Sequence, residues 1–198
     1  MPFMSRYLSV ALVVGLASVM ACADKATPAS KDSAIALLNR PVTTVKAVQA
    51  LGADRDFLRS LGDRHKGMIA LAHLTKESPR DLAVKPLAVR IDNEHDGEID
   101  QIVTMLERDY KDPYTPRISA ADQAALNDLK TKDGAAYDRA FLEHTIAHCT
   151  EARAMIDAYL PAAASEAARA LATSIRGRLD KEIPEFTAML AKSAPARG

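Results

Sequence analysis

The chain has 198 residues, enough for one domain or two small ones, and its 48% hydrophobic content is ordinary for a protein with a packed core. Its 26 basic and 26 acidic residues cancel to a formal net charge of zero, which argues against a nucleic-acid partner. Tryptophan is absent and aromatic residues make up 5%, which argues against a surface that stacks bases.

Residues 1–22 have the composition of a bacterial export signal. Arg6 supplies a positive charge, and the stretch from Tyr7 to Met20 is almost entirely apolar but too short for a comfortable membrane-spanning helix. The small and polar residues 23–34 are typical of a flexible tether. Residues 193–198 are expected to be a disordered tail. The sequence therefore predicts an exported protein whose folded part lies between these two segments.

The signal ends in Val19-Met20-Ala21-Cys22, which resembles the lipobox of bacterial lipoproteins. The resemblance implies that Cys22 is lipidated and that this lipid attaches the protein to the membrane. Ala23 rather than Asp follows, which in Gram-negative lipoproteins implies the periplasmic side of the outer membrane. The alternative is an ordinary cleaved signal in which Cys22 is incidental. With Cys22 lipidated, Cys149 has no partner in the chain and is either buried and inert or a reactive or metal-binding thiol.

The mature chain repeats itself at a spacing of 84 residues. An ungapped self-match gives 14 identities over the 53 positions from Asp54 to Leu106. This constant register predicts that each unit is a helical hairpin and that the two hairpins pack on each other. The units are residues 54–110 and 138–192, within one domain over residues 35–192.

Apolar residues recur at steps of three and four in both units, as in helices with one buried face. In chain order we expect a short helix from Thr43 to Leu51, a hairpin turning at Pro79, a linking helix over residues 120–130 capped by Ser119, and a hairpin turning at Pro161. No segment alternates with the period of a strand. The predicted fold is all-α: a ferritin-like four-helix bundle of two repeated hairpins, with a short extra helix before each repeat.

Two motifs in the repeat units resemble those of a known family. The first, F-L-x-M-M-x-x-H-H-x-x-A-x-x-M, is matched in part by Phe141, Leu142, His148, Ala152 and Met155. The second, I-x-x-x-Q-x-x-E-I-x-x-M-x-x-W-L, is matched in part by Ile91, Glu98, Ile99 and Leu106, and by Ile175, Glu182, Ile183 and Leu190. Through residues 54–190 the chain resembles the domain-of-unknown-function family 305, ferritin-like proteins of the bacterial envelope. Some members are associated with copper handling through His and Met residues, so the resemblance implies a copper-related role.

A carboxylate interrupts the apolar face of the second helix in each unit. These residues are Glu98 and Glu182, and a charged carboxylate is costly to bury unless it is paired or metal-bound. Arg64 lies midway along the first helix opposite Glu98, and His148 lies at the equivalent place opposite Glu182. One interpretation is therefore two buried ion pairs, Arg64–Glu98 and His148–Glu182, that fix the helix register.

The other interpretation is a metal site in the second unit. His144 and His148 are spaced i, i+4, which places two imidazoles on one helix face within reach of one ion. Glu182 is the candidate third ligand, and Cys149 lies nearby in the sequence.

A second candidate metal site lies in the first unit, formed by His65, His95 and Glu98 with Met68 as a soft donor. Imidazole, thioether and thiolate ligands suit copper or zinc. No Glu is followed three residues later by His, which argues against a di-iron oxidase of the ferritin type. No catalytic constellation is evident, so we do not expect an enzyme.

Two functions remain open. The first is a lipid-anchored periplasmic protein that binds or buffers a transition metal, with copper favoured. The second is a structural or interaction lipoprotein of the envelope whose buried ion pairs are purely architectural.

Overall fold

The computed structural model describes residues 42–78, 80 and 82–193, and this part of the chain is helical without strands. The helices are α2 (Val42–Lys76), α3 (Lys85–Tyr110), α4 (Ala120–Lys130), α5 (Gly134–Tyr159) and α6 (Glu166–Lys192), with a short 3-10 turn η1 (Leu160–Ala162). The predicted all-α fold is confirmed. None of these helices combines the length and the apolarity needed to cross a membrane. The predicted signal, tether, lipidated Cys22 and Pro79 turn lie outside the described residues, as does the tail beyond Ser193.

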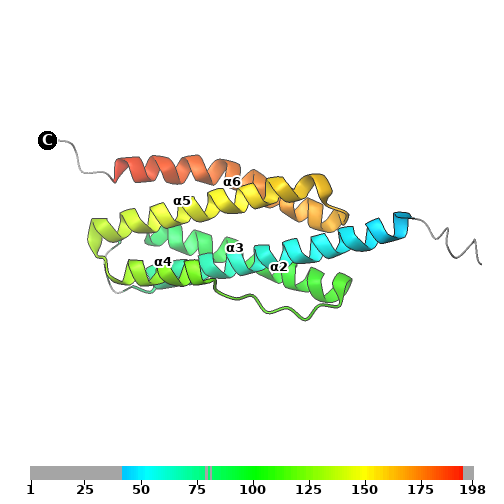
Figure 1. The fold of residues 1–198 in the computed structure, drawn as a ribbon. Coiled ribbons are helices and arrows are strands. Elements are labelled where there is room, and N and C mark those ends of the chain that lie inside the picture. Colours follow the sequence, from blue (N-terminus) through cyan, green and yellow to red (C-terminus); the bar gives the residue numbers. More distant parts are fainter. Residues whose placement is uncertain (1–41, 79, 81, 194–198) are drawn as a thin grey trace, which may run out of the picture. The chain divides into compact units, whose positions relative to one another are not determined.

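Helices α2 and α3 form one hairpin, and α5 and α6 form the other, as the sequence repeat predicts (Figure 1). The expectation of a separate helix over residues 43–51 is wrong, because α2 runs without a break from Val42 to Lys76. Gly52 is the residue there that most disfavours a helix, and its cost of about 1 kcal/mol relative to alanine is too small to end one.

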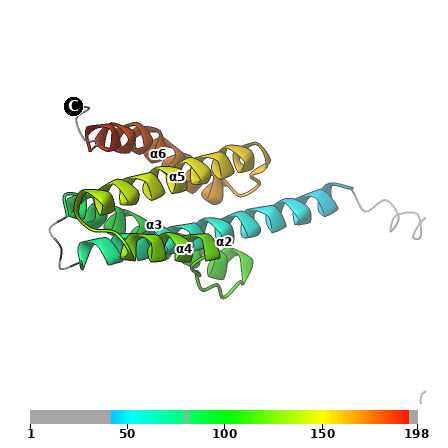
Figure 2. The ribbon, with the colours of Figure 1, turned by 60° about the vertical axis from the view of Figure 1, so that its left-hand side comes forward.

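Helix α4 links the two hairpins and packs against α2 and α5 (Figure 2). It begins at the predicted cap, where the hydroxyl of Ser119 accepts a hydrogen bond of 3.1 Å from the backbone N–H of Asp122. The side chain of Asp122 packs against Gly67 of α2, where a Cβ atom would overlap its carboxyl group. The missing side chain at Gly67 therefore leaves room for the carboxyl group of Asp122 against α2.

The helices share one continuous hydrophobic core drawn from both hairpins. Its largest fully buried side chains include Tyr137, Phe141, Phe186, Leu58, Leu61 and Met68. Buried polar groups are few beside these apolar ones, so each of them calls for a partner or a ligand.

Candidate metal centre

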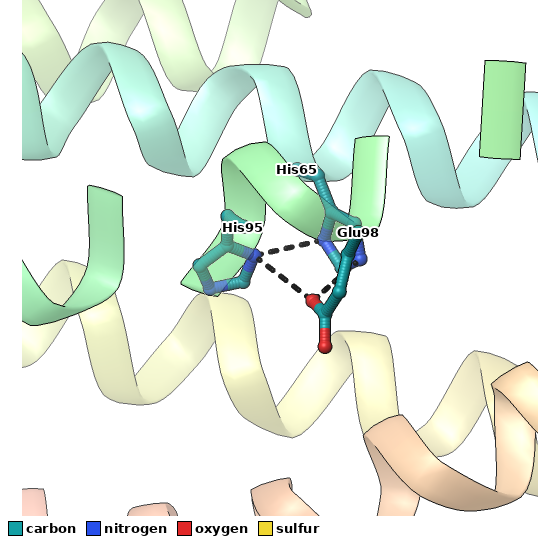
Figure 3. Close-up of side chains that lie close together, drawn as sticks. All are labelled: His65, His95 and Glu98. Atoms are coloured by element: carbon teal, nitrogen blue, oxygen red, sulfur yellow. Dashed lines mark hydrogen bonds and ion pairs between the residues drawn. The ribbon is translucent and has the colours of Figure 1, made fainter. Parts of the chain in front are cut away.

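Three predicted ligands of the first unit come together where α2 faces α3. His65 projects from α2, while His95 and Glu98 lie three residues apart on one face of α3 (Figure 3). The Nδ1 atoms of the two histidines are 3.0 Å apart. Oε2 of Glu98 is 3.1 Å from Nε2 of His65 and 3.7 Å from Nδ1 of His95. Within the described residues, this is the one group of three His, Cys, Asp or Glu side chains whose ligand atoms all lie within 4.8 Å of one another.

Both imidazoles are buried, with 2% and 4% of the side-chain surface of His65 and His95 exposed. Burial lowers the pKa of His65, although Glu98 opposes this effect. Burial lowers the pKa of His95 further, and the charges of His65 and Arg178 act in the same direction. A neutral imidazole has one ring nitrogen with a free lone pair. Of the two Nδ1 atoms that face each other, one must therefore accept a hydrogen bond from the other. Nε2 of His65 is buried without an aligned hydrogen-bond partner.

Glu98 supplies an anionic group to this cluster. Burial alone would raise its pKa, but the contact with His65 and the charge of Arg178 outweigh burial and lower it. Arg178, on α6, holds both carboxylate oxygens, with Nη2 at 2.7 Å from Oε2 and Nε at 3.2 Å from Oε1. The result is an ionised carboxylate beside two neutral imidazoles.

The same guanidinium holds Glu182, with Nη1 of Arg178 at 2.6 Å from Oε2. Burial raises the pKa of Glu182 to about 7; Arg178 opposes the shift and Glu94 adds to it. The side chains of Glu98 and Glu182 are 15% and 7% exposed, so both carboxylates do lie largely inside the bundle. One arginine therefore serves two buried carboxylates from different hairpins.

The two predicted ion pairs, Arg64–Glu98 and His148–Glu182, do not form. Arg64 donates instead to Glu151 at 2.6 Å and to the backbone carbonyl of His148 at 3.2 Å. The prediction failed because it treated each hairpin as self-contained. Helices α2 and α5 lie in contact, so Arg64 faces the equivalent position of the other unit, and Arg178 reaches Glu98 from α6.

The predicted set in the second unit is not brought together. Nε2 of His144 lies 3.0 Å from Asp128, and Nδ1 of His148 lies 3.5 Å from Asp122, both on α4. Cys149 is 2% exposed, and burial, with the charge of Glu182 adding to it, raises the pKa of its thiol to about 12. This buried thiol fits the inert alternative rather than a reactive one. Packing of α4 against α5 gives these histidines carboxylate partners that the hairpin alone does not offer.

Comparison with known proteins places the chain in a family. The model of the family described as "Domain of unknown function (DUF305)" matches residues 54–190. The chain belongs to this family. The predicted resemblance is thereby confirmed, and no curated protein matches the chain.

Three solved structures share the DUF305 fold of this chain. CopM in its Cu(II)-bound form is 19% identical with a TM-score of 0.62, over 71% of this chain and 97% of its own. A DUF305 fragment from Deinococcus radiodurans is 24% identical with a TM-score of 0.63, over 71% and 96%. A DUF305 protein from Streptomyces coelicolor, whose name calls it secreted, is 17% identical with a TM-score of 0.63, over 74% and 95%.

Arg178 is the residue beside this cluster that sequence reasoning missed. It precedes Glu182 by four residues, so both side chains share one face of α6, and that spacing was the available signal. Met68, the predicted soft donor, is fully buried in the hydrophobic core, which suits a packing role.

Proposed function

We propose that this protein binds one transition-metal ion through His65, His95 and Glu98. The observation that carries the proposal is the buried pair of imidazoles whose Nδ1 atoms face each other at 3.0 Å, beside an ionised carboxylate. Metal binding requires unprotonated imidazole, and burial of both rings already favours that form.

The spacing of these groups fits a single ion. Zinc lies about 2.0–2.1 Å from imidazole nitrogen, so two ligand atoms of one ion are separated by at most about 4.2 Å. The Nδ1 atoms at 3.0 Å satisfy this limit, as does Oε2 of Glu98 at 3.7 Å from Nδ1 of His95, and one ligand atom from each of the three residues lies within 4.8 Å of the other two. Two nitrogen ligands and one oxygen ligand suit copper(II) or zinc.

Copper is the favoured ion. CopM, which shares the fold, is known in a Cu(II)-bound form. The role we propose is sequestration or buffering of that ion.

We also propose that the protein acts outside the cytoplasm as a lipid-anchored envelope protein. Support comes from the resemblance of residues 1–22 to an export signal, from the resemblance of their end at Cys22 to a lipobox, and from the Streptomyces coelicolor relative whose name calls it secreted. Labelling of cells with a radioactive fatty acid should mark the wild-type protein in the outer-membrane fraction. A Cys22→Ser variant that is labelled equally would contradict lipid attachment at this residue.

A purely architectural role is the second candidate. It is favoured by Arg178, which already pairs with both Glu98 and Glu182. In that case the buried ions fix how α3 and α6 meet, and the two histidines simply complete the packing.

Calorimetric titration of the purified protein with Cu(II) and with Zn(II) separates these candidates. We expect one ion per chain, bound more tightly than micromolar, and loss of that binding in His95→Gln. His73→Gln is the matched control, because His73 is half exposed on α2 and lies outside the cluster. Binding weaker than micromolar in the wild-type protein would contradict the metal proposal and leave the architectural one.

A further inference from the structure

A positive side chain lies directly beside the proposed metal ligands. The guanidinium of Arg178 is 19% exposed and contacts three carboxylates of two helices. Besides the hydrogen bonds to Glu98 and Glu182, its Nη1 is 3.8 Å from Oε2 of Glu94. Arg178 is therefore a cation surrounded by three carboxylates.

The sequence repeat shows how unusual this arginine is. Glu98 and Glu182 are equivalent residues, 84 positions apart, whereas the equivalent of Glu94 is Arg178. The two units therefore bring three carboxylates and one guanidinium to the contact between α3 and α6, where strict repetition would bring four like charges.

Arg178 and the proposed metal site use the same carboxylate oxygen of Glu98. Oε2 of Glu98 is 2.7 Å from Nη2 of Arg178, and the same oxygen is 3.1 Å from Nε2 of His65 and 3.7 Å from Nδ1 of His95. A metal ion that used this oxygen would lie close to a fixed positive charge. Because burial weakens screening, the repulsion between the two cations would be strong.

We propose that Arg178 is an internal cation that competes with the metal for Glu98 and thereby limits the affinity of the site for divalent ions. The proposal rests on the proposed function. Binding of a divalent ion shifts the guanidinium away from Glu98 toward Glu94 and Glu182, which it already contacts.

There is space for this movement on the outer side of the arginine. An open cavity of about 520 Å³ borders it between α3 and α6. Its lining includes Arg90, Glu94, Ser174, Arg178, Lys181 and Glu182. The carboxylates among these can hold the displaced guanidinium, so the charge of the cluster is rearranged rather than left unpaired.

The test compares the metal affinities of Arg178 variants of the full-length protein. Arg178→Gln removes the competing charge and should tighten Zn(II) binding by about tenfold or more. The gain for Ag(I), a monovalent probe, should be smaller, because repulsion scales with the charge of the ion. Arg178→Lys keeps a cation and should stay near the wild-type affinity. Arg176→Gln is the matched control, since Arg176 lies on α6 but pairs with Asp157 and Asp180.

A second readout comes from the metal-free protein. Arg178→Gln should lower its melting temperature, because Glu98 and Glu182 lose their common partner, while added Zn(II) should raise the melting temperature by more than in the wild type. If the single variant does not fold, Arg178→Gln/Glu182→Gln removes the second carboxylate as well and should show the same tighter binding.

Each result distinguishes the inference from the proposed function. Wild-type binding that Arg178→Gln leaves unchanged or weakens would overturn the inference alone. Binding by neither protein would overturn both. Binding by Arg178→Gln but not by the wild type would overturn the proposed function and support the competition at its extreme.

Discussion

Asp54 and Asp138 occupy the same position in the two repeat units, and each accepts hydrogen bonds from the N-terminal end of a helix in the other unit. Asp54, on α2, accepts from the backbone N–H groups of Ala164 and Ser165 at 3.1 and 2.7 Å, just before α6. Asp138, on α5, accepts from those of Ala83 and Val84 at 3.1 and 3.4 Å, just before α3. The hairpins thus cap each other, which couples their folding.

This exchange predicts that Asp54→Ala strongly destabilises the protein. Asp54 is fully buried and also accepts a hydrogen bond of 2.6 Å from the hydroxyl of Tyr159, so the variant leaves three donors without an acceptor. We expect the free energy of unfolding to fall by about 2–4 kcal/mol in urea denaturation. Asp56→Ala, at an exposed position on the same helix, is the control and should change it by less than about 0.5 kcal/mol. Equal losses in the two variants would refute the capping role.

Two glycines in helices should respond to alanine in opposite directions. At Gly67 a Cβ would overlap the carboxyl group of Asp122, so Gly67→Ala must displace this group from its contacts with Ser119 and His148 and should cost about 1–3 kcal/mol. At Gly97 nothing lies within 4 Å, so Gly97→Ala should gain up to about 1 kcal/mol from helix propensity. Thermal unfolding of both variants measures this, and a stabilised Gly67→Ala protein would contradict the close packing of the Asp122 carboxyl group on Gly67.

The raised pKa of Glu182 predicts a specific pH dependence of stability. A carboxyl group with a folded-state pKa of about 7, above its ordinary 4.5, contributes stability that is present below 4.5 and is lost as the pH rises through about 7. Glu182→Gln cannot ionise, so its stability relative to the wild type should improve between about pH 5 and pH 8. Urea titrations across this range measure the effect. Glu185→Gln, at an exposed position, should run parallel to the wild type, and a parallel Glu182→Gln curve would show that this carboxyl ionises normally.

The lowered pKa values of His65 and His95 predict that protons compete weakly with a metal ion. Both rings stay neutral at pH values where an exposed histidine is protonated. Between about pH 7.5 and pH 6, Zn(II) affinity should therefore fall by less than the factor on the order of ten expected for two ordinary histidines. Calorimetry at the two pH values measures this, and a loss of that full factor would mean that the rings are solvated in solution.

Most of the fold could be predicted from local sequence patterns. Apolar steps of three and four, the cap at Ser119 and the turn at Pro161 depend on near neighbours, so the hairpins and the linking helix could be predicted. The repeat added the equivalence of the two hairpins. The repeat does not predict the contact between α2 and α5. That contact places Arg64 beside Glu151.

The candidate site shows the same division. His95 and Glu98 belong to one helix face, so their proximity could be expected, and the adjacent helix of the hairpin adds His65. Arg178 comes from the other hairpin, and the angle at which two hairpins pack is not encoded in either periodicity. Likewise, His144 and His148 contact carboxylates of α4, and only the tertiary packing of α4 brings these groups together.

We propose that the metal ion binds to the first unit and not to the second, and one comparison tests this directly. Copper and zinc stoichiometry is measured after equilibrium dialysis for two double variants, His65→Gln/His95→Gln and His144→Gln/His148→Gln. We predict that the first variant loses the bound ion while the second retains one ion per chain at the wild-type affinity. Retention of the ion by the first variant and its loss from the second would contradict the account.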